Sequence, residues 1–431
     1  MEIVGILVLV ISFVILLLLG VPVAFSIGVA TLLTMLVSIP FEPAVTTVAQ
    51  RMATGLDSFT LLAIPFFILA GQIMNQGGIA RRLIDFAKSM VGMLPGGLAY
   101  VQIIAAMLFG SISGSAVATA SAIGGFMGPQ MEKEGYDREF ATALNITSST
   151  TGLVIPPSNI LIVYSLASGG ASIAALFLAG YLPGILVGLS LMAVSGYFAI
   201  RKKYPVDDRV PLRVAVRKFL DAIPSLFLII LVIGGIVAGI FTATEASAIA
   251  VIYALGLSLY YRGFKMGELK EVFLSSCNIT AIVALLIATS MAMSWIMSYE
   301  NIPVLVSETL IALSDNPFVI LIIINMILLA VGIFMDITPA VLIFTPIFLP
   351  LVVEMGVDPI HFGIIMILNL CVGLCTPPVG SVLFVGCGIS NVPITSVIKP
   401  LLPLFVAMII SLLLITYIPE ISLFLPRLFG Y

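Results

Sequence analysis

The feature that most restricts how this chain can fold is its scarcity of charge: residues 271 to 398 contain neither lysine nor arginine. Over all 431 residues, 61% are hydrophobic and 9% are charged, and the mean hydropathy is +1.25. Soluble domains carry about 25% charged residues, so a soluble fold could not cover this apolar surface. Because a membrane span needs roughly 20 apolar residues, the apolar runs predict about 10 to 13 membrane segments.

The apolar runs are continuous and lack the two-residue alternation of a membrane barrel, so we expect an all-α polytopic membrane protein. The first run, MEIVGILVLVISFVILLLLG, is longer than the core of a signal peptide and has no basic leader. We therefore expect it to be a retained first helix.

Basic residues are unevenly distributed, and their positions predict the topology. Seven of the 18 lysines and arginines fall in 201–218 and three fall in 262–270. The positive-inside rule places both clusters in the cytoplasm. The residues between the two clusters are enough for two membrane spans, one that leaves the cytoplasm and one that returns to it. Segment 204–218 is predicted to be a cytoplasmic linker that lies along the membrane.

The two halves of the chain repeat each other at an offset of 221 residues. At this offset, glycine, proline and aspartate residues of the first half align with the same residue types in the second: Pro129, Gly135, Asp137, Gly152, Pro156 and Pro157 with Pro350, Gly356, Asp358, Gly373, Pro377 and Pro378. We predict a first repeat over 1–203 and a second over 219–431. The basic residues are too few in the second half to fix its orientation. Inversion is favoured because the linker starts this half in the cytoplasm.

Two segments predict re-entrant helical hairpins. Phe109–Gly125 is crowded with glycine and hydroxyl residues between short apolar runs, which is typical of a hairpin that turns within the membrane. Its counterpart contains Asp336, Thr338 and Pro339. The hairpins are predicted over about 95–131 and about 317–353.

Two further segments predict helices that break within the membrane. Pro156 and Pro157, like Pro377 and Pro378, lack amide hydrogens and interrupt the helical hydrogen bonds. The carbonyls before each pair lose their partners and can bind cations, and half-helix amides can bind anions. The broken helices are predicted over about 140–168 and about 360–390.

Each of these segments has a structural alternative. Glycine-rich and serine-rich membrane helices often pack closely without binding a ligand. Their occurrence as two matching pairs favours a functional site. Asp336 lies between two apolar runs, and an intramembrane carboxylate is a functional candidate by default. Its alternative role is to cap a half-helix.

Other classes of function are poorly supported by the sequence. Cys371 and Cys375 are one helical turn apart, but with His361 as the one histidine, a packed thiol pair is a better interpretation than a transition-metal site. There is no catalytic motif, no phosphate-binding loop and no basic stripe suited to nucleic acid. We expect no enzyme activity and no cofactor. An ion gradient is the natural source of energy.

Five motifs occur in an order that resembles a known family: FGSISGSAVATASAIG, GLVIPPSN, GIFTATEA, MDITPA and CTPPVG. Together they are similar to the large membrane subunit (M) of tripartite ATP-independent periplasmic (TRAP) transporters, and the resemblance covers nearly the whole chain. It implies a bacterial inner-membrane protein with two inverted repeats and an elevator architecture. It also implies sodium-driven import of a dicarboxylate, sialic acid or sugar acid. The implied partners are a periplasmic binding protein (P) and a separate four-helix membrane subunit (Q).

The resemblance also implies two sodium sites and a substrate site between the hairpin tips. The first sodium site would contain Ser113, Ser115, Thr119, Gly152, Pro156, Ser158 and Asn159. The second would contain Asp336, Thr338, Gly373, Thr376 and Val379. Substrate would contact Ser115, Ser158, Asp336 and Thr376. A carrier of this architecture that works without a binding protein, a passive anion channel and a membrane enzyme are the alternatives.

Overall fold

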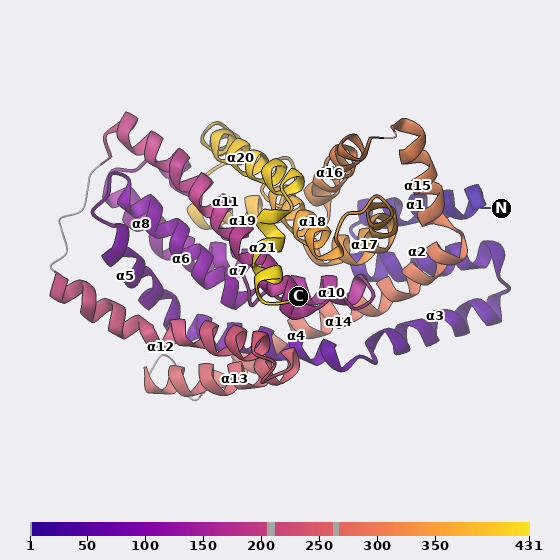
Figure 1. Ribbon diagram of the computed structural model, residues 1–431, viewed down its shortest axis with the longest axis horizontal. Helices are drawn as coiled ribbons and strands as arrows, with labels where there is room; N and C mark the ends of the chain where they lie inside the picture. The colour runs from indigo at the N-terminus through magenta and orange to yellow at the C-terminus, as the bar shows by residue number, and fades with distance from the viewer. Residues whose placement is uncertain (1, 205–211, 262–266, 315) are drawn as a thin grey trace.

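All elements that the computed structural model describes, over residues 2–204, 212–261, 267–314 and 316–431, are helices (Figure 1). Within these described ranges, eight helices are long and apolar enough to cross a membrane, and six shorter ones are also apolar. The expected all-α polytopic membrane fold is therefore confirmed. The arms of the hairpins are longer than the short apolar runs that the sequence suggested, because the helices continue through flanking glycine and polar residues.

Outer helices of both halves pack together into one group, which we call the scaffold. In the first half these are α1 (Glu2–Leu18), α2 (Val23–Ser38), α3 (Phe41–Leu56), η1 (Phe59–Leu62) and α4 (Ala63–Gln76). In the second half they are α12 (Leu212–Val237), α13 (Ala243–Tyr260) and α14 (Leu269–Tyr299). Helix α14 packs against α2, α3 and α4, and α13 packs against α4 and α12. Two shorter helices, α5 (Ile79–Val91) and α15 (Ile302–Leu313), connect the scaffold to the hairpins.

The remaining helices form the hairpins, the broken helices and the helices that follow them. The first set is α6 (Gly97–Ser113), α7 (Ala116–Thr119), the π-helical turn η2 (Ala120–Gly124), α8 (Gly125–Lys133), α9 (Arg138–Thr151), α10 (Asn159–Ala167) and α11 (Ile173–Lys202). The second set is α16 (Pro317–Phe334), α17 (Ile337–Glu354), α18 (Pro359–Gly373), α19 (Ser381–Ser390), α20 (Ile394–Tyr417) and α21 (Glu420–Leu428). Of the predicted linker, residues 205–211 lie outside the described residues, and the following residues begin α12.

The two sets repeat each other in backbone detail. Helices α7, α9 and α11 start 221 residues before α17, α18 and α20. The turns before α9 and α18 each use a glycine with positive φ, Gly135 at 83° and Gly356 at 82°, a conformation that costs other residues a steric clash. Both proline pairs contain a cis peptide bond.

Contacts between the two sets show that they run in opposite directions. At the start of α9, Lys202 and Tyr204 donate hydrogen bonds to Asp137, which hold the pKa of this carboxyl below its usual value. The neighbouring basic cluster makes this the cytoplasmic end. Because α9 and α10 cross together as one interrupted span, Tyr164 near the end of α10 lies towards the periplasm. Its hydroxyl donates to Pro359 O at 2.6 Å, so α18 begins at the periplasmic side.

The reciprocal contact agrees with this orientation. At the end of α19, Ile389 and Ser390 line a small cavity with Glu132 and Arg138, at the cytoplasmic start of α9. Helix α18 and helix α19 therefore cross from the periplasm to the cytoplasm, opposite to α9 and α10. The expected inversion of the second repeat is confirmed.

Inversion predicts that two equivalent positions face opposite sides of the membrane. Lys133 and Glu354 are both exposed and end the second arm of their hairpins. With the exposed Cys277 replaced by serine, we expect Lys133→Cys to react with an impermeant maleimide only in inverted vesicles. Glu354→Cys should react only in right-side-out vesicles. Labelling of both from one side would contradict inverted repeats.

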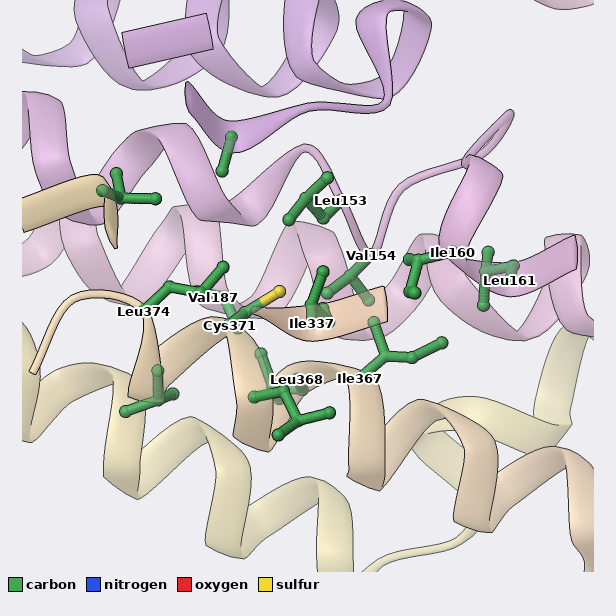
Figure 2. Close-up of a cluster of buried hydrophobic side chains, with 14 of the residues drawn as sticks. Leu153, Val154, Ile160, Leu161, Val187, Ile337, Ile367, Leu368, Cys371 and Leu374 are labelled. Carbon is green, nitrogen blue, oxygen red and sulfur yellow. The ribbon is translucent and has the colours of Figure 1, made fainter. Parts of the chain in front are cut away.

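The core joins the two repeats through apolar side chains (Figure 2). Leu153, Val154 and Leu161 from the first broken helix gather with Ile337, Leu368 and Leu374 from the second repeat. Helix α10 also packs against α17, and α19 packs against α9 and η2. Since lipid tails are as apolar as leucine, this association depends on close van der Waals packing between the helices. The interlocked packing fixes the positions of the hairpin tips relative to each other.

Candidate functional site

The tip of the first hairpin is a two-residue break between α6 and α7. Gly114, with a φ of 62°, ends α6, and Ser115 caps α7 by accepting a bond from Ala118 N at 3.2 Å. Behind the tip, Thr119 donates to Ser115 O at 2.8 Å, and its hydroxyl lies 3.2 Å from that of Ser113. These bonds order the hydroxyl and carbonyl oxygens of the tip in one small cluster.

The second hairpin turns in the same way with a carboxylate in place of the serine. Helix α16 ends at Phe334, Met335 is extended and Asp336 occupies the N-cap position of α17, equivalent to Ser115. Asp336 therefore occupies the capping position that its alternative role predicted. However, its side chain makes no capping bond, unlike the side chain of Ser115.

Each hairpin is fixed to its broken helix by a contact between two glycines. A Cβ on Gly152 would lie 2.4 Å from the Cα of Gly110, and one on Gly373 would lie 2.6 Å from the Cα of Gly332. Real Cβ atoms do not approach backbone this closely, so only glycine fits at these crossings. The glycine residues allow the backbone of each hairpin arm to lie directly against the break in the helix.

Most hydroxyls near the first break bond to their own helix. Thr147, Ser149 and Thr151 donate to carbonyls three or four residues earlier. The hydroxyl of Ser158, at the start of α10, is buried and has no hydrogen-bond partner among the described residues. At the second break, Thr376 donates to Val372 O at 2.9 Å, a carbonyl that also accepts from Cys375 N at 3.1 Å.

Both tips and both breaks meet around one cavity of about 330 Å³. The tips of both hairpins and the first residues of the half-helices α10 and α19 form one wall of the cavity. The scaffold helices α4 and α14 form the other wall. The polar and charged residues that line it, among those the structure describes, are Gln72, Ser113, Ser115, Asn159, Asp336, Thr338 and Ser381. Asp336 is the one charged residue among the described residues that line the cavity, and its side chain is exposed to this space.

Comparison with known proteins identifies the group to which this architecture belongs. Residues 10–421 match the family described as "Tripartite ATP-independent periplasmic transporter, DctM component". The chain belongs to the DctM family, the large permease subunits of TRAP transporters. The resemblance found in the five motifs is thus confirmed.

Relatives of this large TRAP subunit match it over nearly their whole lengths. An uncharacterized protein, YgiK, of Salmonella typhimurium is 56% identical over 97% of this chain and 96% of its own. The C4-dicarboxylate TRAP transporter large permease protein DctM of Rhodobacter capsulatus is 39% identical over 96% and 97%. The sialic acid TRAP transporter large permease protein SiaM of Vibrio cholerae is 37% identical over 96% of each chain.

A solved structure shows the same fold at low sequence identity. The Alcanivorax borkumensis YdaH transporter, reported to have an unusual topology, superposes with a TM-score of 0.66 over 87% of each chain at 13% identity. Together, these comparisons show a transporter permease and not an enzyme. The protein is a multi-pass protein of the inner membrane. TRAP large subunits in general are partnered by a small membrane subunit and a periplasmic binding protein.

The structure of this TRAP permease brings some of the predicted site residues into the cavity and leaves others behind it. Ser113, Ser115, Asn159, Asp336 and Thr338 line the cavity. The others form the supporting layer or face elsewhere: Thr119, Gly152, Pro156, Ser158, Gly373, Thr376 and Val379. Of the four residues that were predicted to contact substrate, Ser115 and Asp336 line the cavity, whereas Ser158 and Thr376 do not.

Two polar lining residues were missed by the sequence analysis. Gln72 is the one polar residue that the scaffold wall contributes among the described lining residues, and it interrupts an apolar helix, a signal that could have been noticed. Ser381 is the first residue of α19, and its buried hydroxyl has no hydrogen-bond partner among the described residues. Its position directly after the CTPPVG motif would have indicated the start of the second half-helix.

Proposed function

We propose that this TRAP large subunit couples inward sodium flow to the import of an organic acid, which a periplasmic binding protein delivers. One observation supports this proposal above all: a cavity between two hairpin tips and two helix breaks, with Asp336 as its one charged lining residue within the described part of the chain. A cation has an obvious site there, and an organic anion has no cationic side chain to meet.

Charge repulsion explains why an anionic substrate would need sodium in order to bind in this cavity. Two like charges at about 4 Å repel by about 4 kcal/mol at an effective dielectric constant of about 20. A carboxylate substrate beside Asp336 therefore needs a compensating cation. Sodium, as a hard ion, would be satisfied by the carbonyl, hydroxyl and carboxylate oxygens that the tips and breaks provide. Anion binding is thereby made dependent on sodium.

The two sodium sites remain those predicted from the sequence, one at each tip. Around Ser113 and Ser115, the cluster with Thr119 supports the first site, with Gly152, Pro156, Ser158 and Asn159 in the adjoining break. The cavity position of Asp336 and Thr338 supports the second, with Gly373, Thr376 and Val379 in its break. The repeat equivalence of Ser115 and Asp336 supports the assignment of one ion to each tip.

The acid group of the substrate would bind at the half-helix starts. Asn159 begins α10 and Ser381 begins α19, and both line the cavity. Amides at the start of a helix attract anions without a cationic side chain. Relatives are named for C4-dicarboxylate, sialic acid and 2,3-diketo-L-gulonate, all of which are organic acids. We therefore propose a carboxylate-bearing solute, with selectivity residing mainly in the binding protein.

The composition of the cavity walls supports an elevator movement. On the scaffold wall, Ile64, Ile68, Ile279 and Val283 are apolar. The tips and half-helices carry nearly all of the polar groups. A group of helices that binds ions and solute could slide along such a wall without breaking hydrogen bonds. The hairpins and broken helices are the proposed moving part.

Uptake into proteoliposomes tests the proposed function. The chain would be reconstituted with its small subunit, with the binding protein and a labelled carboxylate outside. We expect uptake only when an inward sodium gradient and the binding protein are both present. Uptake without the binding protein would contradict the proposed dependence on a periplasmic binding protein. Uptake indifferent to sodium would indicate proton coupling or a channel, and would contradict the sodium sites.

A further inference from the structure

A second cavity lies at the cytoplasmic side, away from the proposed transport site. It has a volume of about 470 Å³ and lies between α5 and the first turns of α12. Its lining residues are Gly78, Arg81, Arg82, Asp85, Lys218 and Asp221. Five of these six are charged, in a chain that has only 9% charged residues. Such a concentration of charge at one membrane face requires a physical explanation.

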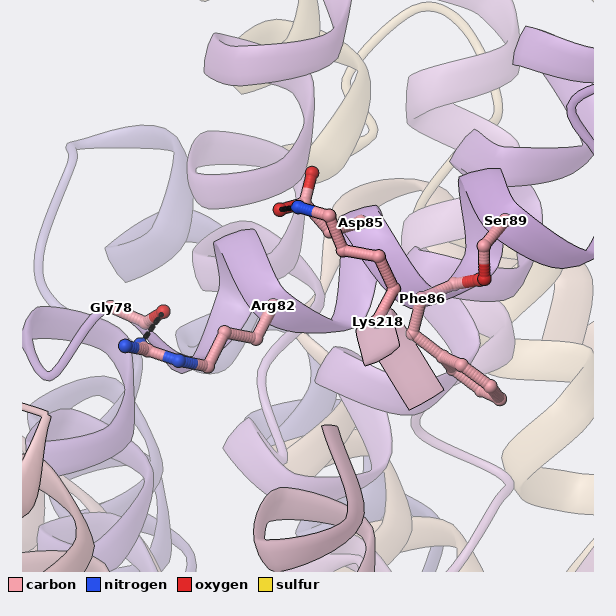
Figure 3. A network of polar contacts seen from close by, with 6 residues as sticks. All are labelled: Gly78, Arg82, Asp85, Phe86, Ser89 and Lys218. Carbon is pink, nitrogen blue, oxygen red and sulfur yellow. Dashed lines mark hydrogen bonds and ion pairs between the residues drawn. The ribbon is translucent and has the colours of Figure 1, made fainter. Parts of the chain in front are cut away.

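The guanidinium groups in this cavity are held in position without a carboxylate partner. Arg82 lies 3.5 Å above the ring of Tyr261. It also donates to Gly78 O at 3.1 Å (Figure 3). Arg81 lies 5.9 Å from the ring of Phe126, in helix α8 of the first hairpin. Among the described residues, neither arginine forms an ion pair within 4 Å. A phosphate is a suitable partner for guanidinium groups ordered in this way.

The acidic residues of the cavity have different surroundings. Lys218 donates to Asp85 at 2.6 Å, so this pair neutralises itself (Figure 3). Asp221 forms no ion pair within the described part of the chain. The cavity thus offers two cations, Arg81 and Arg82, and one carboxylate for a ligand. This pattern suits a ligand that carries a phosphate and a positive group.

Exposed apolar side chains lie on the outer face of α12. Leu220, Ile223 and Phe227 are exposed by 57%, 38% and 45%. Their spacing of three and four residues places them along one face of the helix, about half a helical turn away from Lys218 and Asp221. This stripe therefore faces the lipid and not the cavity, and the charged residues of the same helix lie within reach of lipid headgroups.

We propose that this cavity binds the headgroup of a zwitterionic phospholipid of the cytoplasmic leaflet, with an ethanolamine phosphate as the recognised chemistry. The phosphate meets Arg81 and Arg82, and the ammonium group meets Asp221. The lipid bridges α5, the scaffold helix α12 and, through Arg81 over Phe126, helix α8 of the first hairpin. An anionic headgroup without an ammonium group would leave Asp221 unpaired beside a phosphate.

The test is native mass spectrometry of the complex with its small subunit, with added palmitoyl-oleoyl phosphatidylethanolamine or phosphatidylglycerol. We expect one retained phosphatidylethanolamine. Because a charge-assisted hydrogen bond is lost, Arg81→Gln and Asp221→Asn should each lower its affinity by about tenfold. Arg81→Lys should restore much of the binding. Arg201→Gln, at an exposed arginine of the same membrane face, should have no effect.

Several results would overturn the proposal. Retention of phosphatidylethanolamine unchanged in both Arg81→Gln and Asp221→Asn would place the lipid elsewhere. Preference for phosphatidylglycerol, with binding raised by Asp221→Asn, would indicate an anionic lipid. Displacement of the lipid by inorganic phosphate would assign the cavity to a free ion. A bound lipid that is present with the chain alone and lost in the complex would assign this surface to the small subunit. Thermal unfolding of each variant separates lost binding from lost folding.

Discussion

Replacing Asp336 by asparagine is expected to lower sodium-driven uptake strongly while the protein stays folded. The substitution keeps the shape and hydrogen-bonding capacity of an N-cap residue but removes the negative charge. An interaction with a charged group contributes about 1.5–3 kcal/mol, so sodium affinity should fall by roughly 10- to 100-fold at this site. Uptake at a sodium concentration that just saturates the wild type should fall by a similar factor.

Asp358→Asn provides the matched control for Asp336. Asp358 is also an N-cap aspartate in the second repeat, but it accepts a bond from Ile360 N at 2.7 Å and does not line the transport cavity. Asparagine can accept the same bond, so uptake and thermal stability should stay close to the wild type. If Asp336→Asn kept full sodium-driven uptake, the second sodium site would be wrong. If both variants failed equally, the effect would come from lost folding and not from lost sodium binding at Asp336.

Replacing Gly152 by alanine is expected to disrupt the first hairpin and with it transport. A Cβ at this position would lie 2.7 Å from the carbonyl carbon of Gly110 and 2.9 Å from the amide nitrogen of Ser111. Because both neighbours are backbone atoms, a rotamer change cannot relieve the contact. Overpacking of this kind costs about 1–3 kcal/mol. We expect a lower melting temperature and uptake reduced by about tenfold or more, since the tip must move for the helices to separate.

Gly128→Ala is the control for this prediction. Gly128 lies within helix α8 of the same hairpin, and a Cβ there would meet no atom within 4 Å. Alanine favours helix over glycine by about 1 kcal/mol, so this variant should be unchanged or slightly more stable. Equal behaviour of the two variants would show that contact between Gly152 and Gly110 is not required. Gly373→Ala should repeat the result of Gly152→Ala in the second repeat, because it meets Gly332 in the same way.

Local chemistry in the sequence determined the membrane fold and the positions of its interruptions. Low charge required burial in lipid. The proline pairs at 156–157 and 377–378 required breaks in helices, whatever the rest of the chain does. The repeat at an offset of 221 residues relates the hairpin segment Phe109–Gly125 to the segment that contains Asp336. These features depend on a few neighbouring residues, which is why they can be recognised in the sequence.

Only the tertiary structure decided which of these residues face the same space. Gln72 and Ser381 share a cavity with Asp336 because α4, α17 and α19 meet there, although they are far apart in the chain. Thr376 was predicted to contact substrate, but its hydroxyl bonds to Val372 O and lies outside the cavity lining. The charged cavity between α5 and α12 likewise joins residues from both halves. Helix rotation and packing set these contacts, and neither is encoded by the residues next to a motif.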